Sequence, residues 1–399
     1  MRDTKDLHRR HFLVGAAGAA GAVVTVGGGG FGTAAMAQEA KGLPSYASWK
    51  DPDAMIVHSK QTLETKRGRI GTSIVTPNDE VYIRNNVPPP SEEIVANRDT
   101  WQVSFEGLRN AQALTVGELK TLGIETVATV LQCSGNGRAF FDHEASGTQW
   151  TVGAAGCILW SGVPVRAIVE ALGGIEHGRK FMTSTGGEVL PEGIDPKTII
   201  VERSVPIDAM ENAILAWEMN GEPISLAHGG PLRIIIPGYY GVNNIKYVKK
   251  VAFTETESDA KIQQSGYRVR PVGVKGAPDQ SSMWEMPAKS WITHPLMDAR
   301  TGRVQIHGVA MGGMHAVKKV EVSTNGGETW NEASFIGPDL GRYAWRPFVL
   351  AANLAPGTYM IASRATDANG NIQPEDVEPN ERGYGHNGWR DHAVDVTVA

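Results

Sequence analysis

Cys133 stands at the start of a glycine-rich loop that favours a reactive or metal-binding thiolate. The β-branched, apolar run at residues 126–132 predicts a buried strand that ends at this loop, and Arg138 follows five residues after the cysteine. Exposed backbone amides and a nearby cation favour the thiolate form, which is both a nucleophile and a metal ligand. A lone cysteine is more often a small buried hydrophobe, and we assign that role to Cys157 in the apolar segment 154–160.

The rest of the composition restricts the kinds of site that are possible. Two cysteines in 399 residues cannot form a disulfide framework, no Cys/His spacing is typical of zinc, and no CxxCH haem motif occurs. Redox chemistry would therefore need a bound cofactor and a partner that removes the electrons. The net charge of −5 and 41% hydrophobic residues are typical of a globular protein, without the basic excess of a nucleic-acid binder.

The first 37 residues predict an export signal. Residues 9–13 (RRHFL) match a twin-arginine motif, a glycine-rich apolar run follows, and residues 35–37 (AMA) offer a cleavage site. We expect export to the periplasm with no stable membrane anchor, the alternative being a charged N-terminal helix. This route carries folded proteins, usually because a cofactor is inserted in the cytoplasm, so a bound cofactor is expected.

The elements that must position Cys133 predict an α+β fold with two domains. The first, residues 42–270, has no regular βαβ rhythm, which argues against a doubly wound sheet. We predict strands at residues 101–105, 126–132 and 232–236, and helices at residues 114–122, 163–172 and 209–219.

The second domain, residues 285–399, follows a Pro/Gly/Ser-rich connector at residues 270–282. Short strand-like runs recur about every ten residues, separated by turn signals such as Asn325-Gly326-Gly327 and Asn369-Gly370. The pattern indicates an immunoglobulin-like β-sandwich without a disulfide. The predicted strands are residues 304–309, 317–324, 343–350, 359–367 and 393–398.

Several segments resemble the sulfite oxidase family of molybdopterin enzymes, in order and spacing. Residues 131–138 (LQCSGNGR) are similar to its LQCxGNxR signature, and residues 82–88 (YIRNNVP) to its RNHxP segment. Further similar segments are residues 217–223 (WEMNGEP), 228–233 (HGGPLR), 237–246 (PGYYGVNNIK), 323–330 (STNGGETW) and 367–374 (DANGNIQP). The closest resemblance is to bacterial periplasmic haem-free sulfite dehydrogenases.

The resemblance implies a molybdenum centre with one pterin dithiolene and Cys133 as the single protein ligand. A polarizable thiolate suits a metal that changes oxidation state. It also implies a set of cofactor-binding residues around the pterin and its phosphate: Asn85, Asn86, Cys133, His228, Arg233, Asn244, Ile245 and Lys246. Asn86 stands where the family often has a histidine.

The resemblance assigns the substrate pocket to Arg84, Arg138, Trp150 and Tyr267, which would hold a sulfur oxyanion. At two positions the sequence departs from the family pattern, and both changes predict a pocket with less positive charge than in relatives. A further arginine of the family's second domain aligns near His315, and the basic residue before the pocket tryptophan is missing from residues 146–149 (SGTQ). Arg203 and Arg268 are candidates to restore some of this charge.

The expected function is a periplasmic molybdenum-dependent sulfite dehydrogenase that passes electrons to an external c-type cytochrome. By resemblance, the sandwich would form a homodimer. Two alternatives keep the cofactor: a sulfane dehydrogenase subunit of a thiosulfate-oxidising complex, and a sulfoxide reductase. A third, from another class, is an exported β-sandwich binding module in which Cys133 is structural.

Overall fold

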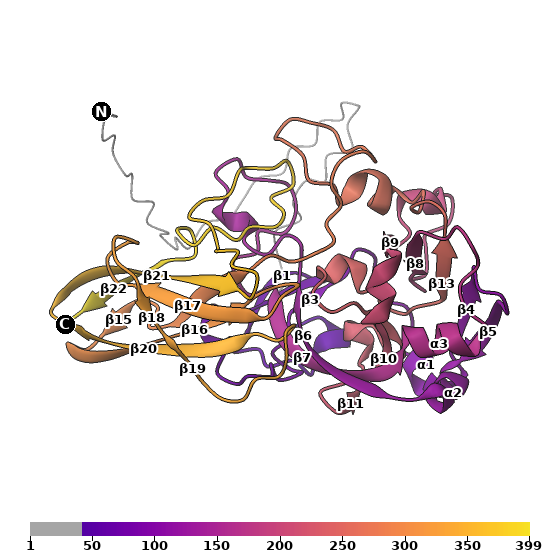
Figure 1. The fold of residues 1–399 in the computed structure, drawn as a ribbon, viewed down its shortest axis with the longest axis horizontal. Helices are drawn as coiled ribbons and strands as arrows, with labels where there is room; N and C mark the ends of the chain where they lie inside the picture. The colour runs from indigo at the N-terminus through magenta and orange to yellow at the C-terminus, as the bar shows by residue number, and fades with distance from the viewer. Residues whose placement is uncertain (1–41) are drawn as a thin grey trace, which may run out of the picture. The chain divides into compact units, whose positions relative to one another are not determined.

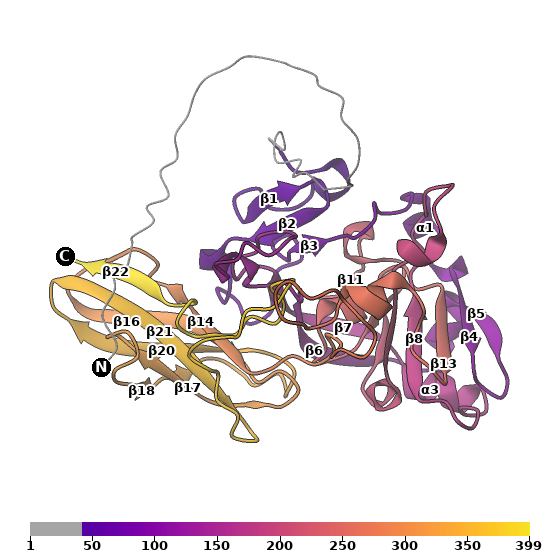
Figure 2. The same ribbon diagram turned by 90° about the horizontal axis from the view of Figure 1, so that it is seen from above.

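The computed structural model describes residues 42–399, so the predicted export signal at residues 1–37 lies outside the described residues. Figures 1 and 2 draw the chain from indigo near residue 42 to yellow at the C-terminus. All the described residues belong to one compact unit. Within them, no helix has the length and apolarity needed to cross a membrane.

A small antiparallel sheet opens the chain and delivers the segment at residues 82–86. Its strand order is β1-β2-β3. The short last strand places Arg84 opposite Thr62 on the middle strand. The bounds are β1 (Met55–Ser59), β2 (Thr62–Thr65) and β3 (Ile83–Arg84).

The second sheet carries the Cys133 loop at the end of β6. This strand is exposed at its first residues and buried over its last five, which agrees with the predicted buried strand. It pairs with β7, so that Gln132 lies opposite Ala155. The order is β11-β10-β7-β6, with β12 also paired to β10. The bounds are β6 (Glu125–Gln132), β7 (Ala155–Pro164), β10 (Ile214–Met219), β11 (Glu222–Pro223) and β12 (Arg233–Ile235).

A third sheet has the order β5-β4-β13-β8-β9, with β4 and β13 parallel and the other pairs antiparallel. The predicted strand at residues 101–105 is β4, shifted by one residue. The bounds are β4 (Gln102–Glu106), β5 (Gln112–Thr115), β8 (Phe181–Thr185), β9 (Glu202–Pro206) and β13 (Lys250–Thr254).

The α-helices of this region are short: α1 (Glu93–Ala96), α2 (Val116–Leu119) and α3 (Val165–Ala171). Helix α2 begins two residues later than predicted, because Thr115 is its N-cap and forms a capping box with Glu118. Helix α3 confirms most of the predicted helix at residues 163–172, and Gly173 and Gly174 follow it with positive φ angles.

The predicted helix at residues 209–219 is wrong. A 3-10 turn ends at Glu211, and residues 214–219 form β10, which is hydrogen-bonded to β7 on one edge and to β12 on the other. All but one of the strand's residues are buried, so its apolar run has no alternation that would distinguish a strand from a buried helix.

The C-terminal region is a two-sheet β-sandwich, as predicted. Its sheets have the orders β14-β16-β20-β19 and β15-β22-β21-β17-β18, and a separate apolar core contains residues from both, including Ile306, Phe348, Val320 and Ile361. The bounds are β14 (Lys289–His294), β15 (Asp298–Ala299), β16 (Gly302–Met311), β17 (Val317–Ser323), β18 (Asn331–Glu332), β19 (Ser334–Phe335), β20 (Arg346–Leu354), β21 (Gly357–Asp367) and β22 (Val394–Val398).

Candidate active site

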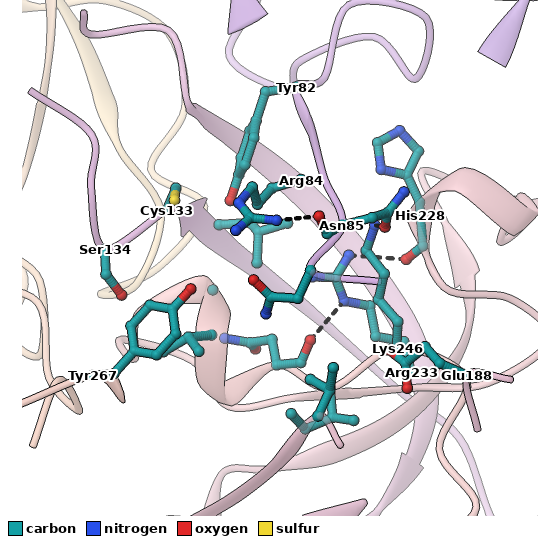
Figure 3. A pocket seen from close by; sticks show the side chains of 17 residues that line it. Tyr82, Arg84, Asn85, Cys133, Ser134, Glu188, His228, Arg233, Lys246 and Tyr267 are labelled. Atoms are coloured by element: carbon teal, nitrogen blue, oxygen red, sulfur yellow. Dashed lines mark hydrogen bonds between the residues drawn. The ribbon is translucent and has the colours of Figure 1, made fainter. Parts of the chain in front are cut away.

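One cavity gathers most of the residues that the sequence singled out. It holds about 650 Å³ of empty space, part of it open to solvent, and receives side chains from the end of β3, the end of β6 and the segment around β12 (Figure 3). Ten of the predicted site residues line it: Arg84, Asn85, Asn86, Cys133, His228, Arg233, Asn244, Ile245, Lys246 and Tyr267.

The Cys133 loop is a tight turn fixed by its own backbone. The Cys133 amide donates to the Ala154 carbonyl at 2.9 Å, and the Asn136 amide donates back to the Cys133 carbonyl at 3.0 Å. A Cβ atom at Gly135 would lie 2.4 Å from Arg138 Nη2, so the arginine folds over its own loop only because that position is glycine. The loop thereby presents the Cys133 side chain to the cavity.

A group of basic side chains lies at the other side of the cavity from Cys133 in Figure 3. Lys246 Nζ donates to Asn85 Oδ1 at 2.6 Å and to the Ala227 carbonyl at 2.5 Å. Arg233 donates from Nε to the Asn244 carbonyl at 3.1 Å and from Nη1 to the His228 carbonyl at 2.9 Å. Behind them, Lys50 Nζ lies 2.8 Å from His228 Nε2, which must accept because an ammonium only donates.

These basic side chains are removed from water to different degrees: Lys50 and Arg233 are buried and Lys246 is half-buried. Among residues 42–399, no carboxylate oxygen lies within 4 Å of the charged nitrogens of Lys50, Arg233 or Lys246. Burial lowers the pKa of both lysines and of His228 well below the usual range, and lowers that of Arg233 to about 10. A bound anion would relieve this desolvation, so the geometry suits a phosphate group.

Glu188 is a lining residue that the sequence did not predict. Its Oε2 atom is buried without a hydrogen-bond partner, and burial raises the pKa of Glu188 to about 7, with Lys246 partly opposing the rise. A carboxyl group here can accept hydrogen bonds from ring amines. Nothing in its sequence neighbourhood distinguishes it from Glu192, four residues further along the chain.

Tyr267 follows a π-helical turn, η10 (Ile262–Gly266), and its ring has one aromatic and one cationic neighbour. It stacks on Tyr384 at 5.0 Å with an interplanar angle of 9°. The Arg203 guanidinium lies 5.7 Å from the Tyr267 ring centroid, and that of Arg138 lies 5.4 Å from the Tyr384 ring. Tyr384 comes from the segment before β22, so the C-terminal region supports the predicted substrate tyrosine directly.

Arg138 and Trp150 are not among the residues that line the cavity. Arg138 is buried and donates to the carbonyls of Arg382 and Thr148, each at 2.8 Å. Trp150 is fully buried and packs edge-on against Tyr82, in the same apolar cluster as Cys133. Both residues therefore lie in the surroundings of the thiol, and their predicted contact with substrate stays a prediction.

The positions of His315, Arg382 and Arg268 show which charged groups lie near the predicted substrate residues. His315 Nε2 lies 2.9 Å from the Asn369 amide and is not a lining residue, whereas Arg382 lies beside Arg138 with its guanidinium 6.0 Å from the Tyr384 ring. Arg382 is a second cation close to Arg138 that the sequence did not predict, and it does not line the cavity either. Arg268 is ion-paired with Glu257 and supplies no free charge.

Comparison with known proteins assigns this fold and site to a class. The oxidoreductase molybdopterin binding domain family matches residues 88–262, and the Mo-co oxidoreductase dimerisation domain family matches residues 280–398. The solved structure of the sulfane dehydrogenase SoxCD from Paracoccus pantotrophus has the same fold, with a TM-score of 0.70 and 22% identity over 93% of this chain and 96% of that one. The class is that of molybdopterin oxidoreductases with a dimerisation domain.

Proteins that are similar in sequence place the chain in one family within this class. The chain is 31% identical to mitochondrial sulfite oxidase from Rattus norvegicus, covering 82% of this chain but 62% of that protein. It is 30% identical to sulfite oxidase from Gallus gallus, covering 79% and 72%, and 28% identical to that from Arabidopsis thaliana, covering 87% and 95%. The chain belongs to the sulfite oxidase family, and the prediction of a molybdenum-molybdopterin cofactor is confirmed.

The residues present fit that cofactor. Cys133 offers a thiol at one side of the cavity, and the cations at the other side lack carboxylate partners. Ser134 lies beside Cys133 and Glu188 beside Arg233 and Lys246 in Figure 3, and Ser134 Oγ and Glu188 Oε2 are buried polar atoms without partners in the described residues. A thiol can bind the metal of a metal dithiolene, and basic side chains can bind a phosphate. Polar atoms without partners can bind a nitrogen-rich ring.

Proposed function

We propose that this protein oxidises sulfite to sulfate at its molybdenum-molybdopterin cofactor. The observation that carries the proposal is the placement of Cys133, Arg84 and Tyr267 on one cavity whose far side holds the basic side chains Arg233 and Lys246. Relatives at about 30% identity that bear the name sulfite oxidase support this substrate class.

When bound, the cofactor supplies a metal that exchanges an oxygen atom and two electrons with the substrate. The chain's own residues would position the oxyanion. Arg84 and the Tyr267 phenol hold it by charge-assisted hydrogen bonds. Burial raises the pKa of Tyr82 well above its usual range, so this lining phenol stays a neutral donor. Because these groups are fixed before the anion arrives, they stabilise developing charge at little reorganisation cost.

The proposed electron acceptor is a separate c-type cytochrome. This sequence has no haem-attachment motif, and reoxidation after each turnover requires that two electrons leave the site. Redox encounters of this kind use small, transient interfaces. Reduction of added cytochrome c by sulfite, followed at its visible absorption band, tests the acceptor; a holoenzyme that turns over with ferricyanide but with no cytochrome would contradict it.

The proposed location is the periplasm, on the basis of the twin-arginine motif at residues 9–13 and the cleavage site at residues 35–37. Replacing Arg9 and Arg10 with lysine is expected to retain the protein in the cytoplasm with its cofactor bound. Cell fractionation with immunodetection measures this, and unchanged export would contradict the assignment.

The substrate is tested by steady-state kinetics with ferricyanide as acceptor, using sulfite and thiosulfate in parallel, and methionine sulfoxide with a reduced dye. We expect kcat/KM for sulfite to exceed that for thiosulfate by at least about a hundredfold, since a site built for one oxyanion rejects poor matches strongly. Arg84→Met should raise the KM for sulfite, while exposed Arg109→Met serves as the control. Turnover of thiosulfate or sulfoxide with no sulfite oxidation would overturn the proposal.

A further inference from the structure

Lys289 is a fully buried amine that the proposed chemistry does not use. It is the first residue of β14 in the sandwich, and its side chain has 1% exposure. Burial lowers the pKa of Lys289 to about 7. Burying a charged lysine costs free energy unless the charge has a partner, so we describe the groups that surround Lys289.

The Lys289 amine reaches across to the loop that carries Cys133. Its Nζ donates to the Asn136 carbonyl at 3.3 Å and to the His386 carbonyl at 2.8 Å. The Asn136 amide in turn donates to the Cys133 carbonyl at 3.0 Å. The backbone of one residue, Asn136, is therefore hydrogen-bonded on one side to the lysine and on the other to the cysteine.

The segment around His386 also holds the Cys133 loop, by hydrogen bonds and close packing. The Gly385 amide donates to the Ser134 carbonyl at 2.8 Å, and the Asn387 amide side chain donates to the Ala288 carbonyl at 3.1 Å. A Cβ atom at Gly137 would lie 2.8 Å from His386 Cβ, so loop and segment are in close contact.

No carboxylate neutralises Lys289 directly. Among residues 42–399, no Asp or Glu oxygen lies within 4 Å of its Nζ. The titratable neighbours are His386, which is bonded to Asp391 at 3.0 Å, and His392, whose ring nitrogens have no partner. Burial lowers the pKa of each imidazole from its usual value and so favours the neutral form of both.

We propose that Lys289 is a positioning residue for the metal centre: its ammonium fixes the Cys133 loop through Asn136 and makes the molybdenum easier to reduce. Reduction adds negative charge at the centre, and a buried positive charge held against the Cys133 loop through Asn136 stabilises the reduced state more than the oxidised state. The inference rests on Cys133 being the metal ligand and on the cofactor; it does not depend on sulfite as the substrate.

The test is a redox titration of the purified holoprotein without substrate, monitored by the Mo(V) electron paramagnetic resonance signal at pH 6, where Lys289 is charged. Lys289→Met should disfavour reduction about tenfold, a fall of about 59 mV for a one-electron couple. Lys289→Arg, which keeps the charge, should stay closer to the wild-type potential. Lys319→Met, which removes an ion-paired surface lysine of β17, should leave the potential unchanged.

Lys289→Gln separates the effect of the charge from that of the hydrogen bonds, because the glutamine amide can still donate to a carbonyl but carries no charge. The same fall in potential is expected, and this variant carries the test if Lys289→Met does not accumulate. Loaded, folded Met or Gln variants with a wild-type potential would overturn the proposal. Absence of a cysteine-bound metal in the wild-type protein, seen by X-ray absorption, would instead remove the ligand assignment and the proposed function with it.

Discussion

The two cysteines differ in environment although both are buried. Cys133 lines the cavity at the end of β6, whereas Cys157 is enclosed within β7, where burial raises the pKa of its thiol to about 12. A thiol held protonated in this way is inert, which agrees with the structural role predicted for Cys157. The contrast allows a matched pair of variants.

Cys133→Ala is expected to remove one sulfur neighbour from the molybdenum and to abolish turnover, because alanine offers no ligand atom. The cations at the other side of the cavity should still retain the cofactor. Cys157→Ala should keep the sulfur count and lose about 1 kcal/mol of stability. X-ray absorption and thermal unfolding measure the two effects, and an unchanged sulfur count in Cys133→Ala would exclude this residue as the ligand.

Glu188 predicts a pH dependence of stability in the cofactor-free protein. Its pKa is raised to about 7 in the folded state, chiefly by burial, whereas the unfolded chain has a value near 4.5. Between these values the folded state holds a proton that the unfolded state has released, so stability falls as pH rises from about 4.5 to about 7.

Glu188→Gln removes this titration, so its advantage over the wild type should grow across that pH window to about 2 kcal/mol and then level off. Urea unfolding at pH 4.5, 6 and 8 measures the difference. Glu192→Gln, an exposed change in the same loop, is the control and should show a flat difference. A flat difference for Glu188→Gln as well would show that this carboxyl group titrates normally.

At the scale of elements, the segment before β22 does more than connect strands. It stacks Tyr384 on Tyr267, accepts a hydrogen bond from Arg138 at the Arg382 carbonyl, and donates one to the Ser134 carbonyl from Gly385. Reciprocal hydrogen bonds between Asn380 and the Tyr384 backbone, both at 2.8 Å, fix its shape. The C-terminal region thereby sets the position of groups in the N-terminal region.

Tyr384→Leu should loosen Tyr267 and raise the KM for sulfite two- to tenfold, since an aromatic pair contributes about 0.5–1.5 kcal/mol. Tyr384→Phe keeps the ring and should behave like the wild type. In a double-mutant cycle, Tyr267→Phe and Tyr384→Leu should be non-additive. Steady-state kinetics measures these effects, and fully additive losses would show that the stack does not act through Tyr267.

At the scale of the whole molecule, the match of residues 280–398 to a dimerisation domain leads us to propose a homodimer. Light scattering coupled to size exclusion should give twice the chain mass at micromolar concentration. A stable monomer under those conditions would contradict the proposal.

The sequence by itself determined the fold class, and its resemblance to a family supplied the cofactor and most of the cavity lining. This was possible because the ligand loop and the cation-bearing segments are local motifs, each contained within ten residues, and because alternating patterns and Asn-Gly turns specify sandwich strands locally. Asn85, Cys133, Arg233 and Lys246 could be singled out before any contact was known.

Only the tertiary structure decided which distant residues complete the site. Tyr384 meets Tyr267 across 117 positions of sequence, and Lys289 meets Asn136 across 153, and neither pair carries a local pattern. The same reason explains the error at residues 214–219, where pairing with strands on both edges overrode an ambiguous apolar run. Long-range packing, which a local pattern does not encode, positions the thiol loop and the tyrosine.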